Sequence, residues 1–316
     1  MLDPRTRRRH HVRNIAQGAL LLGGMVAVLG ALAWLLLGPA GLVAAAVVGV
    51  VLLVARPTVP AGWVLGMYGA RPLPAAVAPD LHRYVRALAA RAGLPAVPTL
   101  YYIPSPMVNA FAVGRRDDAG LAVTDGLLRR LRSRELVGVL AHEIGHIRSD
   151  DLWIMNLSDG LGRLTHALAY AGLFLLLVSV PLSMGGTYAP LWFAVLLTAV
   201  PTLVTLLQLA LSRSREYDAD LQAAVLTGDP EGLASALEAL EASEGRLWER
   251  LMVPRRRAPD PLLLRTHPPT EERTRRLREL VPRADRERLG DERRVPPAGY
   301  PAVQAPVRLR FPGVRW

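Results

Sequence analysis

The sequence predicts a mainly α-helical membrane protein with four transmembrane helices in two hairpins and a separate domain outside the bilayer. Two charge-free runs support the prediction: 42 residues separate Arg13 from Arg56, and 49 separate Arg163 from Arg213. A membrane span needs about 20 apolar residues, so each run is too long for one helix and suits two. The placement of arginine, the third observation, orients the hairpins.

Glycine and proline divide each charge-free run into two spans. The first run breaks at Gly38-Pro39 and the second around residues 184–186. Helices buried in a soluble core are the alternative, but such helices usually carry a polar face and seldom run so far without a charge. The predicted spans are 15–37, 40–55, 164–183 and 189–211.

Arginine is enriched on one side of the predicted hairpins. Five arginines precede the first span, whereas the two hairpin turns carry no charge. The positive-inside rule therefore places both termini and the extramembrane domain of this multi-pass protein in the cytoplasm. A cleaved signal peptide is the alternative for the N-terminus, but its apolar core spans only about 7–15 residues.

These observations divide the chain into six segments. The two segments that flank the second hairpin must either pack together or stand alone, and the motifs described below favour a joint domain. The predicted segments are a basic cytoplasmic N-terminus (1–14), the first hairpin (15–55), the first part of the extramembrane domain (56–163), the second hairpin (164–211), the second part of that domain (212–282) and a basic, proline-rich tail (283–316).

Composition excludes several classes of function. The chain has no cysteine, which excludes disulfide scaffolds, thiolate metal sites, iron–sulfur clusters and cysteine nucleophiles. Its net charge of +11 comes from arginine, without the groove-fitting cluster or interleaved aromatic residues that nucleic-acid binding requires. We therefore expect no nucleic-acid partner.

Residues 142–146 read His-Glu-Ile-Gly-His and carry the clearest chemical signal. They lie in an apolar-periodic segment, 133–147, which predicts a helix with Ser133 as its N-cap. Side chains four apart share a helix face, so His142 and His146 can bind one zinc ion. Glu143 is then placed to take a proton from a water molecule. Two surface histidines on a capped helix are the alternative.

A catalytic zinc ion takes three protein ligands and keeps one position open for water. The segment 212–220 offers Glu216 and Asp220, which are again four apart on a predicted helix. One of these carboxylates can bind the metal while the other holds an imidazole by its second nitrogen. Ordinary helix-surface charges are the alternative for this pair taken alone.

The order of these motifs resembles the HtpX-type membrane zinc proteases, which are related to the CAAX prenyl proteases. The resemblance covers residues 1–282 and includes HEIGH, the following hairpin, SRSREYDAD at 212–220 and THPPTEER at 266–273. It implies a gluzincin-like helical core with a small β-sheet. It also implies one zinc ion per subunit held by His142, His146 and Glu216, with Glu143 as catalytic base and Asp220 as an outer carboxylate.

Two further site predictions are less direct. Short strands are predicted at 99–103, 109–114 and 120–124, and the resemblance makes Asn109, Ala110 and Phe111 part of an edge strand that binds substrate. A plain hairpin that closes the core is the alternative. The resemblance also places His267 near the active site, where an imidazole can stabilise an oxyanion; packing at a helix entry is the alternative.

The predicted function is that of a zinc-dependent endopeptidase, and the resemblance implies misfolded or surplus membrane proteins as substrates. Fifteen arginines between Arg246 and Arg294 suggest anionic lipid headgroups as partners, with a solvated face as the alternative. Rival functions are a CAAX-type processing protease and a catalytically silent membrane scaffold. A transporter is disfavoured because the spans hold almost no ionisable residue. Histidine and glutamate also bind other divalent ions, so zinc rests on the motif and the resemblance.

Overall fold

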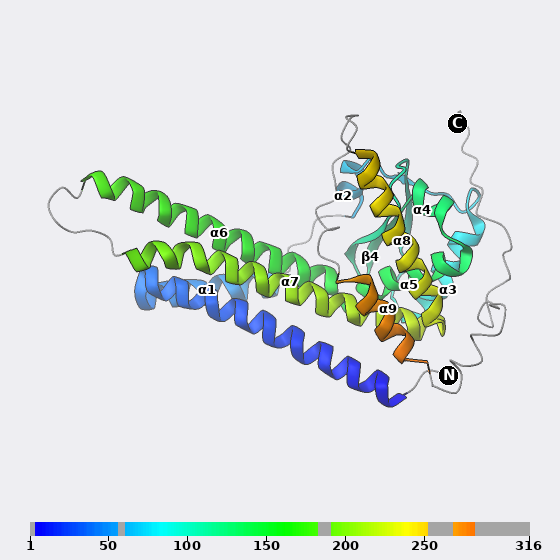
Figure 1. Cartoon of the computed structure of the whole chain (residues 1–316), viewed down its shortest axis with the longest axis horizontal. Coiled ribbons are helices and arrows are strands. Elements are labelled where there is room, and N and C mark those ends of the chain that lie inside the picture. Colours follow the sequence, from blue (N-terminus) through cyan, green and yellow to red (C-terminus); the bar gives the residue numbers. More distant parts are fainter. Residues whose placement is uncertain (1–3, 56–60, 183–190, 252–267, 282–316) are drawn as a thin grey trace. The chain divides into compact units, whose positions relative to one another are not determined.

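The computed structural model describes residues 4–55, 61–182, 191–251 and 268–281, which fall into two compact units (Figure 1). The helical unit comprises residues 15–57 and 153–214. The α/β unit comprises residues 1–14, 58–152 and 215–316. The predicted tail, 283–316, lies outside the described residues.

Three long helices of the described chain run through the helical unit. They are α1 (Pro4–Ala55), α6 (Asp151–Leu182) and α7 (Leu191–Thr227), and they run side by side in Figure 1. Met25, Leu161 and Val204, one from each helix, are buried together in an apolar cluster. The three helices therefore pack against one another through apolar side chains.

The predicted break in the first run is confirmed. Gly38 has φ 63° and ψ −150°, a backbone conformation essentially restricted to glycine, and Pro39 follows it without an N–H to donate. Among the described residues, one segment, Arg8–Leu35, is long and apolar enough to cross a membrane, and the arm Leu37–Val51 is apolar but shorter. A mainly helical protein is thus confirmed, whereas four spans in two hairpins stay a prediction.

The α/β unit contains a four-stranded sheet in the order β1-β2-β4-β3. Strand β2 (Thr99–Ile103) pairs parallel with β4 (Asp118–Thr124), and β1 (Arg71–Pro72) and β3 (Ala110–Arg115) pair antiparallel at the two edges. The three predicted strands agree with β2, β3 and β4 to within two residues, whereas β1 was not predicted. Strand β3 therefore keeps one edge unpaired among the described strands.

Within the described ranges, six helices accompany the sheet, and α5 (Ser133–Ser149) carries the HEIGH motif. Its residues Leu136, Leu140 and Ile144 are fully buried in the core. The predicted N-cap is wrong by one residue: Arg132 precedes the helix, and its backbone N–H donates to Glu135 Oε2 at 2.9 Å. The other helices are α2 (Ala61–Met67), α3 (Pro79–Ala92), α4 (Asp125–Arg130), α8 (Pro230–Leu251) and α9 (Thr270–Glu279).

Helix α8 starts at a fixed position relative to α5. Asp229 Oδ1 accepts a hydrogen bond from the backbone N–H of Gly232 at 3.0 Å, which caps α8, and its carboxylate also pairs with Arg134 of α5. Between the two helices, a Cβ on Gly138 would lie 3.0 Å from the Leu233 backbone, so glycine permits the close packing. The N-terminal half of α8 is therefore held against the histidine-bearing helix.

Candidate active site

Helix α5 presents both histidines of the motif on one buried face. The Nε2 atoms of His142 and His146 lie 3.2 Å apart, and each residue is 6% exposed. Their rings meet edge to face, with centroids 4.8 Å apart. The four-residue spacing thus brings two imidazole nitrogens to one point, as the sequence predicts.

Helix α7 supplies a carboxylate to the same point. Glu216 is 3% exposed, and its oxygens lie 3.5 Å from His142 Nε2 and 3.6 Å from His146 Nε2. Gly145 allows this approach, because a Cβ there would lie 3.3 Å from the carbonyl oxygen of Ala219 on α7. The glycine inside the motif therefore lets the two helices pack closely.

The three side chains offer a donor set that fits a divalent metal. One ligand atom from each of His142, His146 and Glu216 lies within 4.8 Å of the other two. Burial by itself lowers the pKa of both histidines, yet the neighbouring carboxylates outweigh it and raise both pKa values above the ordinary one. The site therefore stabilises positive charge, as a metal centre must.

A second carboxylate holds each imidazole by its other nitrogen. Asp220 Oδ1 lies 3.0 Å from His142 Nδ1, and Asp151 Oδ2 lies 3.3 Å from His146 Nδ1. Such contacts fix the ring orientation and place the proton on Nδ1, which leaves the Nε2 lone pair for the metal. Asp220 lies where the resemblance implies.

From the sequence, Asp151 can be interpreted as a group that orients a ligand or as an ordinary charge at a helix end, and the sequence favours the second interpretation. Asp150 ends α5 with φ 57°, and Asp151 then begins α6 with its side chain fully buried. Its other oxygen lies 3.3 Å from Arg215. A carboxylate five residues beyond the second histidine, at the helix end, was the available signal.

Arg273 of α9 forms ion pairs with two of these carboxylates, those of Asp220 and Glu216. It donates to the two oxygens of Asp220 at 2.6 and 2.8 Å and lies 3.3 Å from Glu216 Oε2, with only 4% of the residue exposed. Burial by itself raises the pKa of Asp220, but Arg273 and then His142 outweigh it and hold that pKa at about 2. The ion pair therefore stays charged across the neutral pH range.

Glu143 lies outside the group of metal-binding atoms. Its carboxylate Oε2 accepts a hydrogen bond from the backbone N–H of Ala112 on β3 at 3.0 Å, and the residue is half-buried. A carboxylate beside the histidines that is not a ligand remains available to accept a proton. This placement agrees with the role predicted for Glu143.

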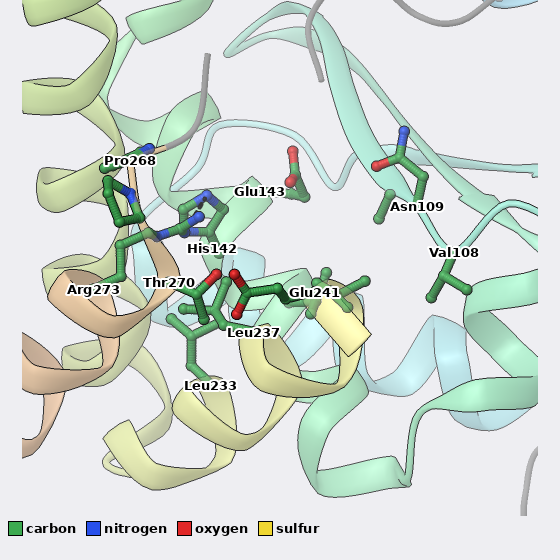
Figure 2. A pocket seen from close by; sticks show the side chains of 14 residues that line it. Val108, Asn109, His142, Glu143, Leu233, Leu237, Glu241, Pro268, Thr270 and Arg273 are labelled. Atoms are coloured by element: carbon green, nitrogen blue, oxygen red, sulfur yellow. Dashed lines mark hydrogen bonds between the residues drawn. The ribbon is translucent and has the colours of Figure 1, made fainter. Parts of the chain in front are cut away.

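A cavity of about 270 Å³, here called the α8 cavity, opens beside His142 and Glu143 (Figure 2). Asn109 and Ala110 line it at the start of β3. Phe111 is not among its lining residues and instead packs edge to face on Tyr68, with ring centroids 5.4 Å apart, because successive strand residues face opposite sides. Asn109 and Ala110 therefore line the site, and Phe111 does not.

The remaining predicted site residue, His267, lies outside the described residues. Its neighbour Pro268 lines the α8 cavity, together with Pro269, Thr270 and Arg273. The catalytic role of His267 stays a prediction.

Comparisons with known proteins agree with this geometry. The family model described as peptidase family M48 matches residues 75–281, which include every residue of the metal cluster. The protease HtpX homolog of Aquifex aeolicus is 39% identical over 233 residues, covering 69% of this chain and 77% of that protein. The protease HtpX homolog of Methylibium petroleiphilum is 34% identical over 292 residues, covering 85% of this chain and 98% of that protein.

One solved structure, the crystal structure of S. mikatae Ste24p, aligns with 85% of this chain and 66% of its own, at 21% identity and a TM-score of 0.48. The family match and the curated relatives establish the classification without it. The chain belongs to peptidase family M48 and is a metalloprotease.

Proposed function

We propose that this metalloprotease is a zinc-dependent endopeptidase. The observation that supports it is the convergence of His142 Nε2, His146 Nε2 and a Glu216 oxygen, with Glu143 beside them and outside the ligand set. Two imidazoles and one carboxylate are a ligand set that catalytic zinc uses. Zinc bound there would act as a Lewis acid on the scissile carbonyl and acidify a water molecule.

The protein's own side chains perform the proton transfers. Glu143 accepts a proton from the attacking water and then delivers it to the departing amine, so one carboxylate serves both halves of the hydrolysis. Asp220 and Asp151 keep the imidazoles oriented throughout. Arg273 keeps Asp220 ionised and holds Glu216 at the centre.

Strand β3 provides a place for an extended substrate. It is an edge strand whose paired side faces β4, and Glu143 contacts its Ala112 N–H. A polypeptide added along this edge would be recognised through main-chain hydrogen bonds, with little dependence on side chains. Such recognition suits a protease that acts on many unfolded sequences.

We assign the activity to the cytoplasmic face of a bacterial inner membrane, with misfolded or surplus membrane proteins as substrates. The apolar segment Arg8–Leu35 and the arginines that precede the first charge-free run support this assignment. This assignment implies two kinds of partner: unfolded polypeptide, and the lipid bilayer with its anionic headgroups.

The test compares the purified parent with Glu143→Gln for metal content and for cleavage of casein. We expect one zinc ion per chain in both, because the substitution leaves the ligand set intact. Cleavage should fall by at least about a hundredfold in the variant, the usual contribution of general acid–base catalysis. Unchanged cleavage in Glu143→Gln would refute the general-base role, and equal metal content in Glu216→Ala and the parent would remove Glu216 from the ligand set.

A further inference from the structure

The α8 cavity has an apolar wall on one helix. Leu233, Leu237 and Leu240 occur at positions i, i+4 and i+7 of α8, so they form one stripe along the cavity. Leu233 and Leu237 are almost fully buried, and Val139 of α5 also lines the cavity. A hydrocarbon chain can pack on this surface without leaving a buried polar group unpaired.

Glu241 follows this stripe directly and places a carboxylate in the same cavity. Figure 2 shows the side chain reaching from α8 into the space in front of Leu237. Glu241 is exposed, and no ion pair joins its carboxylate to another of the described residues. The carboxylate therefore carries an unneutralised negative charge within the described part of the site.

The other charged groups of the cavity are Arg273 and Glu143. Arg273 is a cation paired with Asp220 and Glu216, so it cannot neutralise a basic side chain. Glu143 accepts the Ala112 N–H through Oε2 and has the proton-transfer role proposed above. Glu241 is thus the cavity group best placed to select a charged side chain.

We infer that the α8 cavity is a substrate subsite for a lysine or arginine side chain. The aliphatic stem lies on Leu233, Leu237 and Leu240 while the cationic end meets the Glu241 carboxylate, the arrangement in which long basic side chains are best accommodated. Its volume of about 270 Å³ is below the roughly 300–1,000 Å³ of drug-sized pockets and suits one long side chain. This inference rests on the proposed endopeptidase activity.

The experiment uses the full-length, zinc-loaded chain in detergent and fluorogenic peptides that differ at one position beside the scissile bond. Lysine is compared there with norleucine, which has the same straight stem and no charge, and with glutamate. We expect kcat/KM to favour lysine over norleucine by up to about fivefold, the range of a solvent-exposed ion pair. The glutamate peptide should have the lowest kcat/KM of the three.

Two variants of Glu241 test whether its negative charge sets the preference for lysine. Glu241→Gln should bring the lysine-to-norleucine ratio of kcat/KM close to one, because the charge that favours lysine is removed. Glu241→Arg should invert the preference, so that the glutamate peptide is cleaved faster than the lysine peptide. Glu238→Gln is the matched control: it removes a carboxylate from the same helix, one that bonds Arg278 at 2.8 Å and does not line the cavity.

The possible outcomes separate the subsite from the enzyme activity. Equal cleavage of lysine and norleucine peptides by the parent overturns the inference and leaves the endopeptidase intact. A lysine preference that survives in Glu241→Gln, or that is lost equally in Glu238→Gln, also overturns it. If the zinc-loaded parent cleaves no peptide and no casein, the proposed function fails and the subsite fails with it.

Discussion

At the residue scale, the two imidazoles of the candidate metal site differ in how their second nitrogen is held. Asp220 contacts His142 and is itself clamped by Arg273, whereas Asp151 contacts His146 and lies against Arg215. Both carboxylates are buried, so neither imidazole can exchange its partner for water without opening the site. Carboxylates in this position raise ligand basicity and fix the tautomer.

We therefore predict that Asp151→Asn lowers zinc affinity by about 10- to 100-fold, because an amide orients the His146 imidazole less strongly than a carboxylate does. Competition with a chromophoric chelator measures the affinity directly. Asp150→Asn is the control, since asparagine also tolerates the positive φ of 57° at that position. Equal affinity in Asp151→Asn and the parent would show that the contact with His146 has no influence on the metal.

At the element scale, the metal centre depends on how closely α5 and α7 approach each other. Glycine in a helix interior costs about 1 kcal/mol relative to alanine, so Gly145 weakens α5 as an isolated helix. The loss has a structural reason: a Cβ at this position would lie 3.3–3.4 Å from Ala219 and Gln222 of α7. Three residues before Ala219, α7 carries the third metal-binding candidate, Glu216.

We predict that Gly145→Val reduces zinc bound per chain and destabilises the protein by about 1–3 kcal/mol, the usual cost of overpacking. Its side chain meets backbone atoms of α7, which must move and take Glu216 away from the histidines. Elemental analysis after gel filtration and thermal unfolding are the two readouts. Gly160→Val is the matched control, because a Cβ at Gly160 has no heavy atom of the described residues within 4 Å. Full zinc occupancy in Gly145→Val would contradict the argument.

At the scale of the whole molecule, residues from distant segments meet in the α/β unit. His142 and Glu216 both belong to it, although the second charge-free run lies between them in the sequence. If that run crosses the membrane twice, both segments return to the same side, which the metal cluster requires. The predicted topology and the observed cluster are therefore compatible.

We predict that a reporter fused after Trp316 is cytoplasmic, whereas one inserted within residues 183–190 is periplasmic, because the charge-free turn is translocated and the arginine-rich segments are retained. Paired alkaline phosphatase and fluorescent protein fusions at each position distinguish the two locations. A reporter ahead of Arg5 serves as the internal reference and should match the one at Trp316. A cytoplasmic signal from the 183–190 insertion would show that the second hairpin does not cross.

Features set by neighbours in the chain were predictable from the sequence. The two histidines share a face because helical spacing is local, and α3 has local boundaries, since Pro79 starts it and Gly93 ends it with φ 65°. The kink at Gly38 and strand β2 follow in the same way. For each of these, the determining interactions lie within a few residues.

Contacts between distant segments were decided only by the tertiary structure. Arg273 reaches Asp220 across 53 positions in the sequence, and Glu241 joins a cavity formed by α5, the start of β3 and α9. Asp151 is close to His146 in sequence, yet its role depends on the direction that α6 takes after Asp150. Local periodicity carries no information on such meetings, because the free energy that fixes them comes from packing whole elements against one another.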